Sequence, residues 1–238
     1  MRAAPCGAAR QGVVASGRDG ATNMMQRRIE VSAVFRQFAA IAIVAAFACL
    51  ALPAPSHAQA SVRLQSQSVR VLRDRIEVEY CHGFGCFAVT AVPFKDAEIA
   101  ELTQIMQAGA GSAAEEREAV KQAVAYFERH AAKFAGTGTD IAGNYTLGGD
   151  TSQLDCVDEA RNSTRLLILL EKKGLLRYHR VAKIEGRGNF IDTRYPHNTA
   201  VLQEKATGVK WSVDSWMRHN GDIPEVMTLK RWFKEGYS

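Results

Sequence analysis

The segment that most constrains this chain is a stretch of helical pattern that begins near Cys156 and ends near Gly174. Its later part is almost wholly apolar and holds Leu166, Leu167, Leu169 and Leu170. Ser152 or Asp155 could cap the beginning of the helix, and Lys173 before a glycine is typical of a helix end. Because a helix this apolar must be covered by other elements, the sequence predicts a central, buried helix.

Two kinds of pattern precede this helix. Residues 69–80 and 86–92 alternate apolar and polar side chains on either side of a glycine-bearing loop, which predicts a β-hairpin. Residues 96–107 are expected to form a helix. Ser112, with Glu115 three positions later, is typical of the N-terminus of a second helix, which is expected to reach Gly136. The following segment, rich in Gly, Thr and Asp, is expected to be an irregular loop up to residue 151.

Strand patterns follow the central helix. Three strands are expected, over residues 177–184, 198–203 and 210–214. The second and third are joined by a short glycine-containing turn, so they should be adjacent and antiparallel. A short segment, Leu229–Lys234, closes the chain after Pro224. A hairpin and helices, then a central helix and an antiparallel sheet, indicate the α+β class.

The first 58 residues have the three parts of a secretory signal. An uncharged apolar run of 15 residues follows a segment with three arginines, and it precedes two prolines and a small-residue site at Ser56-His57-Ala58. A membrane span needs about 20 apolar residues, so a retained anchor is the less favoured alternative. Met24 or Met25 would give a leader of more ordinary length, so residues 1–23 are expected not to be translated.

Removal of this leader changes what the charge implies. The whole chain has 30 Lys+Arg and 25 Asp+Glu, but residues 1–58 hold six of the basic and two of the acidic residues, so residues 59–238 carry a net charge of +1. No basic stripe with interleaved aromatic residues remains, which argues against nucleic acid as a partner. We therefore expect a Sec-type signal peptide and a single periplasmic or secreted domain over residues 59–238, without a membrane span after cleavage.

Cysteine spacing indicates one disulfide and one thiol. Cys81 and Cys86 flank a short glycine-bearing loop, and in an oxidising compartment cysteines that can pair tend to do so. A metal site that includes His82 is the alternative, but it lacks enough ligands. Cys156 then has no partner in the exported chain, which indicates a reactive thiol or intermolecular pairing, with a buried inert cysteine as the other interpretation.

Three residues in this part of the chain could form a catalytic site. Cys156 is expected at the N-terminus of the central helix, where the helix dipole favours a thiolate. His197 leads into one predicted strand and Asp214 ends the next, 17 residues later, so the turn between them can bring the two side by side. An imidazole oriented by a carboxylate is a general base for a cysteine nucleophile. The alternatives are that His197 has only a structural role and that Asp214 caps a turn.

At this point the chain resembles a known family. The string Leu154-Asp155-Cys156-Val157-Asp158-Glu159-Ala160 is similar to the Asp-Cys-x-Asp region of bacterial transglutaminase-like cysteine peptidases, a branch of the papain-type enzymes. An aliphatic helix follows the cysteine there, and a histidine-led strand comes some tens of residues later. The resemblance covers roughly residues 152–216. It implies a transglutaminase-like core, with Cys156 as nucleophile, His197 as base and Asp214 as the residue that orients the base.

Other roles at the site follow less directly. Gln153 and the backbone N–H of Cys156 are candidate oxyanion donors. An acidic cluster at the beginning of the helix (Asp155, Asp158 and Glu159) could bind a divalent metal together with His197. Because neighbouring helical positions do not all face one point, no metal and no cofactor is predicted.

Two functions from different classes remain. The first is an exported thiol-dependent amide hydrolase or acyl transferase that acts on a peptide, a protein or the peptide stems of the cell wall. The second is a catalytically inactive transglutaminase-like protein with a binding or assembly role in the periplasm. The unpaired thiol and the Cys-His-Asp order favour the first, whereas the carboxylates near the thiol favour the second because they raise a thiol pKa.

Overall fold

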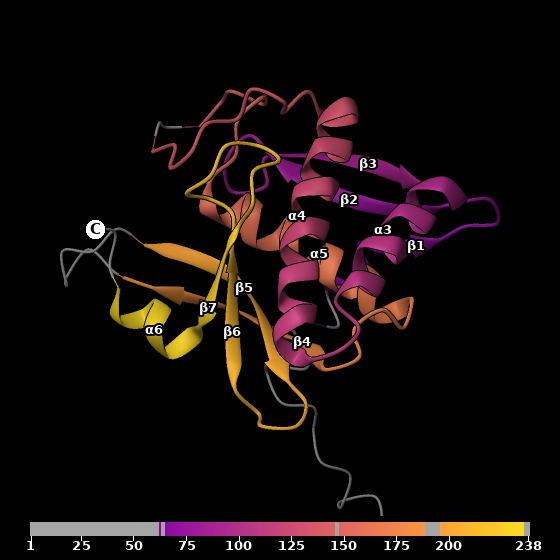
Figure 1. Cartoon of the computed structure of the whole chain (residues 1–238). Coiled ribbons are helices and arrows are strands. Elements are labelled where there is room, and N and C mark those ends of the chain that lie inside the picture. The colour runs from indigo at the N-terminus through magenta and orange to yellow at the C-terminus, as the bar shows by residue number, and fades with distance from the viewer. Residues whose placement is uncertain (1–61, 63–64, 146–147, 189–195, 236–238) are drawn as a thin grey trace, which may run out of the picture. The chain divides into compact units, whose positions relative to one another are not determined.

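Helix α5 (Cys156–Lys172) lies at the centre of the fold, between the two sheets (Figure 1). Its four leucines are fully buried, as the sequence predicts. Of the two predicted caps, Asp155 is the one used, because its side chain accepts hydrogen bonds from the backbone N–H groups of Val157 and Asp158 at 3.0 and 2.9 Å. These contacts fix the position at which α5 begins.

The computed structural model describes residues 62, 65–145, 148–188 and 196–235. The chain divides into two units, residues 1–54 and 55–238, and all the described residues belong to the second. The predicted leader and its cleavage site therefore lie outside the described residues. No helix within the described ranges is long and apolar enough to cross a membrane.

An antiparallel sheet of three strands precedes the helices. Its order is β1 (Val69–Val71), β2 (Ile76–His82) and β3 (Ala88–Phe94). The pairing of β2 with β3 confirms the predicted hairpin. The prediction of one continuous strand over residues 69–80 is wrong, because a turn closed by the Leu72 N–H and the Arg75 carbonyl divides it into β1 and β2.

Two helices pack against this sheet. Helix α3 (Asp96–Ala108) agrees with the predicted helix, and α4 (Ala113–Ala135) begins where Ser112 predicts it. The Ser112 hydroxyl accepts a hydrogen bond from the backbone N–H of Glu115 at 3.2 Å. Gly136 ends α4 with a left-handed backbone (φ 74°), a conformation that glycine adopts without steric cost.

A second antiparallel sheet of four strands follows α5. Its order is β4 (His179–Arg187), β5 (His197–Glu204), β6 (Lys210–Asp214) and β7 (Glu225–Thr228). Strand β7 was not predicted, because a half-buried stretch of four residues carries too little alternation to identify. The short helix α6 (Leu229–Lys234) comes directly after it. Two antiparallel sheets with helices confirm the α+β class.

The two faces of β5 pack against different helices. Ala200 and Leu202 belong to the main core together with the leucines of α5. Val201, between them, belongs to a second cluster with Leu229 and Trp232 of α6. Because side chains alternate along a strand, one face of β5 looks toward α5 and the other toward α6.

Candidate functional site

His197 and Asp214 form a buried hydrogen-bonded pair where β5 begins and β6 ends. His197 Nε2 lies 2.6 Å from Asp214 Oδ2. Antiparallel pairing of Ala200 with Val213 sets the register that brings the two ends together. The imidazole is 1% exposed and the aspartate 7%. The carboxylate thus favours one tautomer of the ring, in which Nε2 carries the proton and its N–H donates a hydrogen bond to Asp214.

A tryptophan from the C-terminal helix completes the environment of this carboxylate. The indole Nε1–H of Trp232 donates to Asp214 Oδ2 at 2.7 Å. Arg187, the cross-strand partner of His197, lies over the Trp232 ring at 4.2 Å and donates to the backbone carbonyls of Trp232 and Glu235. Arg187 therefore fastens α6 onto the strands that carry the pair.

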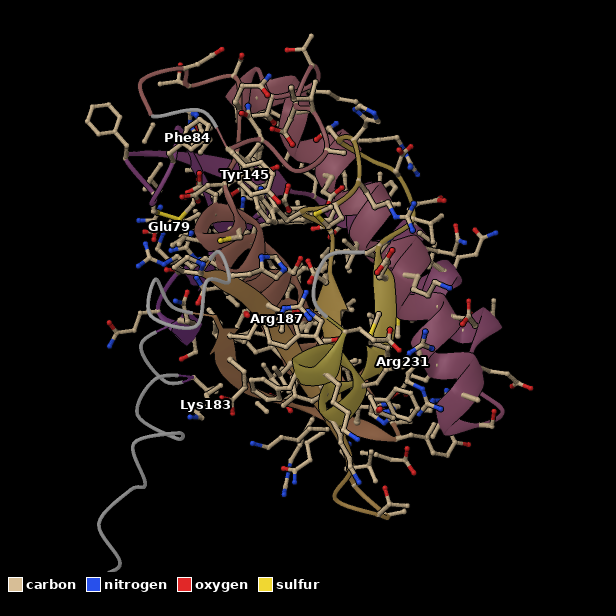
Figure 2. The ribbon with its side chains drawn as sticks, turned by 90° about the vertical axis from the view of Figure 1, so that its left-hand side faces the viewer. Glu79, Phe84, Tyr145, Lys183, Arg187 and Arg231 are labelled. Carbon is tan, nitrogen blue, oxygen red and sulfur yellow. A yellow bond between two sulfur atoms is a disulfide. The ribbon has the colours of Figure 1, made fainter. Side chains whose placement is uncertain are left out.

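Aromatic rings line both sides of the imidazole. The ring centroid of His197 lies 4.8 Å from that of Trp216 and 5.4 Å from that of Trp232. Tyr145 then packs edge-on against Trp216, with centroids 4.9 Å apart. The packing of Trp216 and Trp232 against the imidazole removes the ring from water and restricts its rotation. Figure 2 shows Tyr145 and Arg187 on the same face of the molecule.

Cys156 is the free cysteine of the described chain, and it is the first residue of α5. Its Sγ lies against the two residues that flank His197 in the sequence. The thiol donates to the Pro196 carbonyl at 3.7 Å, and the Asn198 side-chain amide donates to Sγ at 3.8 Å. The cysteine is 5% exposed. The structure therefore places the thiol at the beginning of β5, beside the backbone of the predicted base.

The electrostatic state of the thiol differs from the expectation based on the helix dipole. Burial raises the pKa of Cys156, and the negative charges of Asp155 and Asp214 raise it further. The backbone and side-chain N–H groups of Asn198 act in the opposite direction without cancelling the rise in pKa. At neutral pH the resting sulfur is thus a protonated thiol, so it must lose its proton during a reaction.

The thiol and the imidazole approach β5 from different faces. Asn198 extends toward α5 and contacts Cys156, whereas His197 contacts Trp232 on the α6 side. The sulfur touches the Pro196 carbonyl, directly before the residue that begins the strand. Nδ1 is the ring nitrogen of His197 that does not bond Asp214, and the role of His197 as the base for Cys156 stays a prediction.

Gln153, the predicted side-chain oxyanion donor, fastens a loop. Its Nε2 donates to the Thr139 carbonyl at 2.9 Å, and its Oε1 accepts from the Asn144 amide at 2.9 Å and from the Ile141 N–H at 3.2 Å. These bonds attach the loop after α4 to the segment before α5. The oxyanion role of Gln153 stays a prediction, and it would require an N–H direction other than the one that meets Thr139.

The disulfide between Cys81 and Cys86 is present, which confirms that prediction. It closes a loop in which Gly83, Phe84, Gly85 and Cys86 all have positive φ. Phe84, labelled in Figure 2, and Cys86 adopt this left-handed conformation although they are not glycines, so other contacts must hold them there.

Two carboxylates at the beginning of α5 supply those contacts. Asp158 accepts from the backbone N–H groups of Phe84 and Cys86 at 2.8 and 2.5 Å, and Asp155 accepts from Gly85 at 2.9 Å. The loop is therefore attached to the same helical turn that carries Cys156. This arrangement explains why the segment around the cysteine is so acidic.

The carboxylates considered as metal ligands point in different directions. Asp155 and Asp158 bond the disulfide loop, whereas Glu159 accepts from the Ser215 hydroxyl at 2.6 Å on another side of α5. Within the described ranges, a different set of ligand-type atoms converges, those of Cys81, Cys86 and Asp158, and both of those sulfurs are consumed by the disulfide. Neither arrangement offers the ligands of a metal site.

A second cluster of three acidic residues is buried near the beginning of α5. Glu128 of α4, Asp140 of the following loop and Glu159 are each at most 5% exposed. Burial raises the pKa of Glu128 and of Asp140 to about 7, and it raises that of Glu159 well above its usual value, with repulsion from neighbouring carboxylates adding to the effect. These groups hold protons at a pH where surface carboxyls have lost them.

Two hollows in the described surface lie away from the thiol. One, of about 570 Å³, lies between α3 and α4, and its lining includes Ile105, Ala119 and Tyr126. Another, of about 730 Å³, is lined by residues that include Lys121 and residues around β7. Neither includes a residue of the predicted triad.

Sequence reasoning missed two residues of this site. Asn198 stands directly beside His197, and its polar amide at the beginning of an otherwise apolar strand was the available signal. Trp232 lies 18 residues beyond Asp214 in a short segment, and no local pattern indicates that its indole returns to that carboxylate.

No protein-family model matches this chain, no curated protein is similar to it, and no solved structure matches its fold.

Proposed function

We propose that this protein is an exported thiol-dependent amide hydrolase or acyl transferase, with a transglutaminase-like core and a Cys156-His197-Asp214 triad. One observation carries the proposal. His197 and Asp214 form a buried imidazole–carboxylate pair with a donor–acceptor distance of 2.6 Å. The residues directly before and after His197 contact the free thiol of Cys156. A histidine oriented by a carboxylate beside a cysteine at a helix N-terminus has the composition of a nucleophile with its base.

The chemistry follows from the protonated resting thiol. As Sγ attacks a substrate carbonyl, a carbon–sulfur bond forms, the carbonyl electron pair moves to oxygen, and the thiol proton passes to His197 Nδ1. When this tetrahedral adduct collapses, the bond to the leaving amine breaks and the imidazolium supplies its proton. Water then releases the acyl group in a hydrolase, and an amine takes it in a transferase. Asp214 stabilises the transient imidazolium throughout.

The substrate class follows from the compartment proposed for the mature chain. A periplasmic or secreted enzyme of this kind meets peptides, proteins and the peptide stems of the cell wall. A net charge of +1 over residues 59–238 gives no general preference for polyanions. Tyr145, about half exposed and packed on Trp216, is an aromatic surface near the imidazole against which a substrate side chain could lie.

A second function has its own support. The cysteine is 5% exposed, the pKa of its thiol is raised, and the two hollows described above lie elsewhere. These features suit a protein that keeps the scaffold but has lost turnover, and that binds or assembles with a partner. The apolar part of the hollow between α3 and α4 would then be the surface to examine.

One experiment separates the two functions. The purified protein is mixed with p-nitrophenyl acetate, and release of p-nitrophenolate is followed together with the mass of the protein. An enzyme shows a burst of about one equivalent and a protein heavier by one acetyl group, located on Cys156 by peptide mapping. Cys156→Ala is the matched control and should abolish both.

The opposite result is equally clear. If the wild-type protein releases p-nitrophenolate no faster than the Cys156→Ala variant and gains no acetyl mass, the enzymatic proposal fails and the binding function takes its place. Acetylation on lysine alone would have the same meaning, because it would show reactive surface amines and an inert thiol.

A further inference from the structure

The Asn198 amide is the side-chain hydrogen-bond donor that touches the free thiol. Its Nδ2 lies 3.8 Å from Cys156 Sγ, and the residue follows His197 directly in β5. The thiol hydrogen itself is directed at the Pro196 carbonyl, so the amide approaches the sulfur as a donor while another group accepts from it. Such a donor remains in place when the proton leaves.

The strand geometry assigns this amide and the imidazole to different tasks. Asn198 lies on the face of β5 that looks toward α5, and His197 lies on the other face beside Trp232. Of these two side chains, the amide is the one that contacts the sulfur directly. In the proposed reaction the imidazole takes the proton of the thiol, and a carbonyl carbon bonded to the sulfur would have its oxygen within reach of the amide.

A glycine on the neighbouring strand makes room for this amide. Gly186 of β4 is the cross-strand partner of Asn198. A Cβ at position 186 would lie 3.1 Å from Asn198 Oδ1, which is tighter than ordinary carbon–oxygen contact. Gly186 thus permits the orientation in which Oδ1 lies beside β4 and Nδ2 faces the sulfur.

We infer that Asn198 is the oxyanion donor of this site and that Gly186 is the positioning residue that lets it serve. The inference rests on the proposed thiol chemistry. When Sγ bonds the carbonyl carbon and the electron pair moves to oxygen, the Nδ2–H that meets the sulfur at rest donates to the new oxyanion. A preorganised donor about 3 Å from a developing charge stabilises the transition state more than the ground state. The backbone N–H of Asn198, which also acts on the sulfur, supports this placement.

The inference predicts different effects on two reactions of the same thiol. Acylation by p-nitrophenyl acetate creates an oxyanion, whereas alkylation by iodoacetamide displaces iodide at a saturated carbon and creates none. Asn198→Ala is expected to slow acylation by about 10²- to 10³-fold, the usual effect of losing one oxyanion donor. Alkylation should slow by less than about tenfold, since only thiolate stabilisation by one hydrogen bond is lost.

Two further variants serve as controls for this test. Gly186→Ala leaves Asn198 in place but crowds its amide, so it should slow acylation by an intermediate factor and leave alkylation nearly unchanged. Asn198→Asp has nearly the same shape but replaces the donor with a carboxylate, so both reactions should slow. Circular dichroism and thermal melting establish that each variant is folded before its rates are compared.

The outcomes separate this inference from the function on which it rests. Wild-type acylation of Cys156, with an Asn198→Ala rate within about threefold of it, overturns the inference and leaves the enzyme intact. Equal losses in acylation and alkylation also overturn it, because Asn198 would then act on the thiolate alone. Absence of Cys156 acylation in the wild-type protein overturns both proposals. A selective loss of acylation in both Asn198→Ala and Gly186→Ala supports the inference.

Discussion

The described part of the chain contains two buried histidine–carboxylate pairs, and they differ in the groups that lie beside them. His179 at the beginning of β4 bonds Glu116 of α4 through Nδ1 at 2.8 Å, and its Nε2 lies 3.2 Å from Arg117 Nη1. His197 bonds Asp214 through Nε2 at 2.6 Å, and the free thiol touches its two neighbours. The first pair thus lies against an arginine of α4, whereas the second begins at a residue whose two sequence neighbours touch the free thiol.

The carboxylates of the two pairs have different second partners as well. Glu116 accepts from the backbone N–H groups of Arg177, Tyr178 and His179, so it closes the loop between α5 and β4. Burial acts to raise the pKa of Glu116, but the hydrogen bonds from His179 and this backbone outweigh it and lower the pKa. Asp214 instead takes a side-chain donor, Trp232. We therefore expect the His179–Glu116 pair to stabilise the fold and the His197–Asp214 pair to act in the proposed reaction.

The largest expected effect breaks the candidate catalytic pair. His197→Ala should slow acylation by p-nitrophenyl acetate by about 10²- to 10⁴-fold, because the thiol, whose pKa is raised, loses its general base. Stopped-flow release of p-nitrophenolate measures the rate, and excess imidazole in the buffer should restore part of it. A His197→Ala protein that remains folded and acylates at the wild-type rate would show that His197 is structural.

The matched change breaks the other pair. His179→Ala removes the ring between Glu116 and Arg117 and should lower the free energy of unfolding by about 3–5 kcal/mol, the usual effect of leaving a buried charge without its partner. Urea denaturation followed by tryptophan fluorescence measures this loss. The acylation rate per folded molecule should equal that of the wild type. A slower rate in fully folded His179→Ala would remove the distinction between the two pairs.

A smaller effect comes from the cluster of three acidic residues near the beginning of α5. Folded Asp140 keeps its proton up to about pH 7, whereas an unfolded aspartate, with a pKa of 3.8, loses it earlier. Because the folded state binds more protons between these values, raising the pH through this window lowers stability. Asp140→Asn removes the titration and keeps an acceptor for the Leu154 N–H.

The comparison with the wild type gives the size of that effect. Between pH 4 and pH 6 the wild type should lose about 2 kcal/mol relative to Asp140→Asn, from the difference between the two titrations. Urea midpoints at several pH values measure it. A constant difference across this range would mean that Asp140 ionises in the folded protein as it does in the unfolded chain. The acylation rate near neutral pH gives a readout of whether this group also affects the site.

Local patterns in the sequence determined much of the framework. Leucines at helical spacing, Asp155 and Gly174 identified α5, Ser112 identified the beginning of α4, and the five-residue spacing of Cys81 and Cys86 indicated their disulfide. The short turn after β5 determined that β5 and β6 are neighbours. These features are predictable because their causes act within a few residues, through helical or strand periodicity, capping and loop closure.

Tertiary structure alone decided how the candidate site is completed. Trp232 reaches Asp214 because α6 packs on one face of β5, and Asn198 reaches Cys156 because α5 packs on the other. The helix dipole predicts a thiolate at Cys156, yet burial raises its pKa, since desolvation depends on everything that covers the sulfur. The sequence by itself thus determined which residues could react, and packing across the chain decided their partners and the protonation state of the thiol.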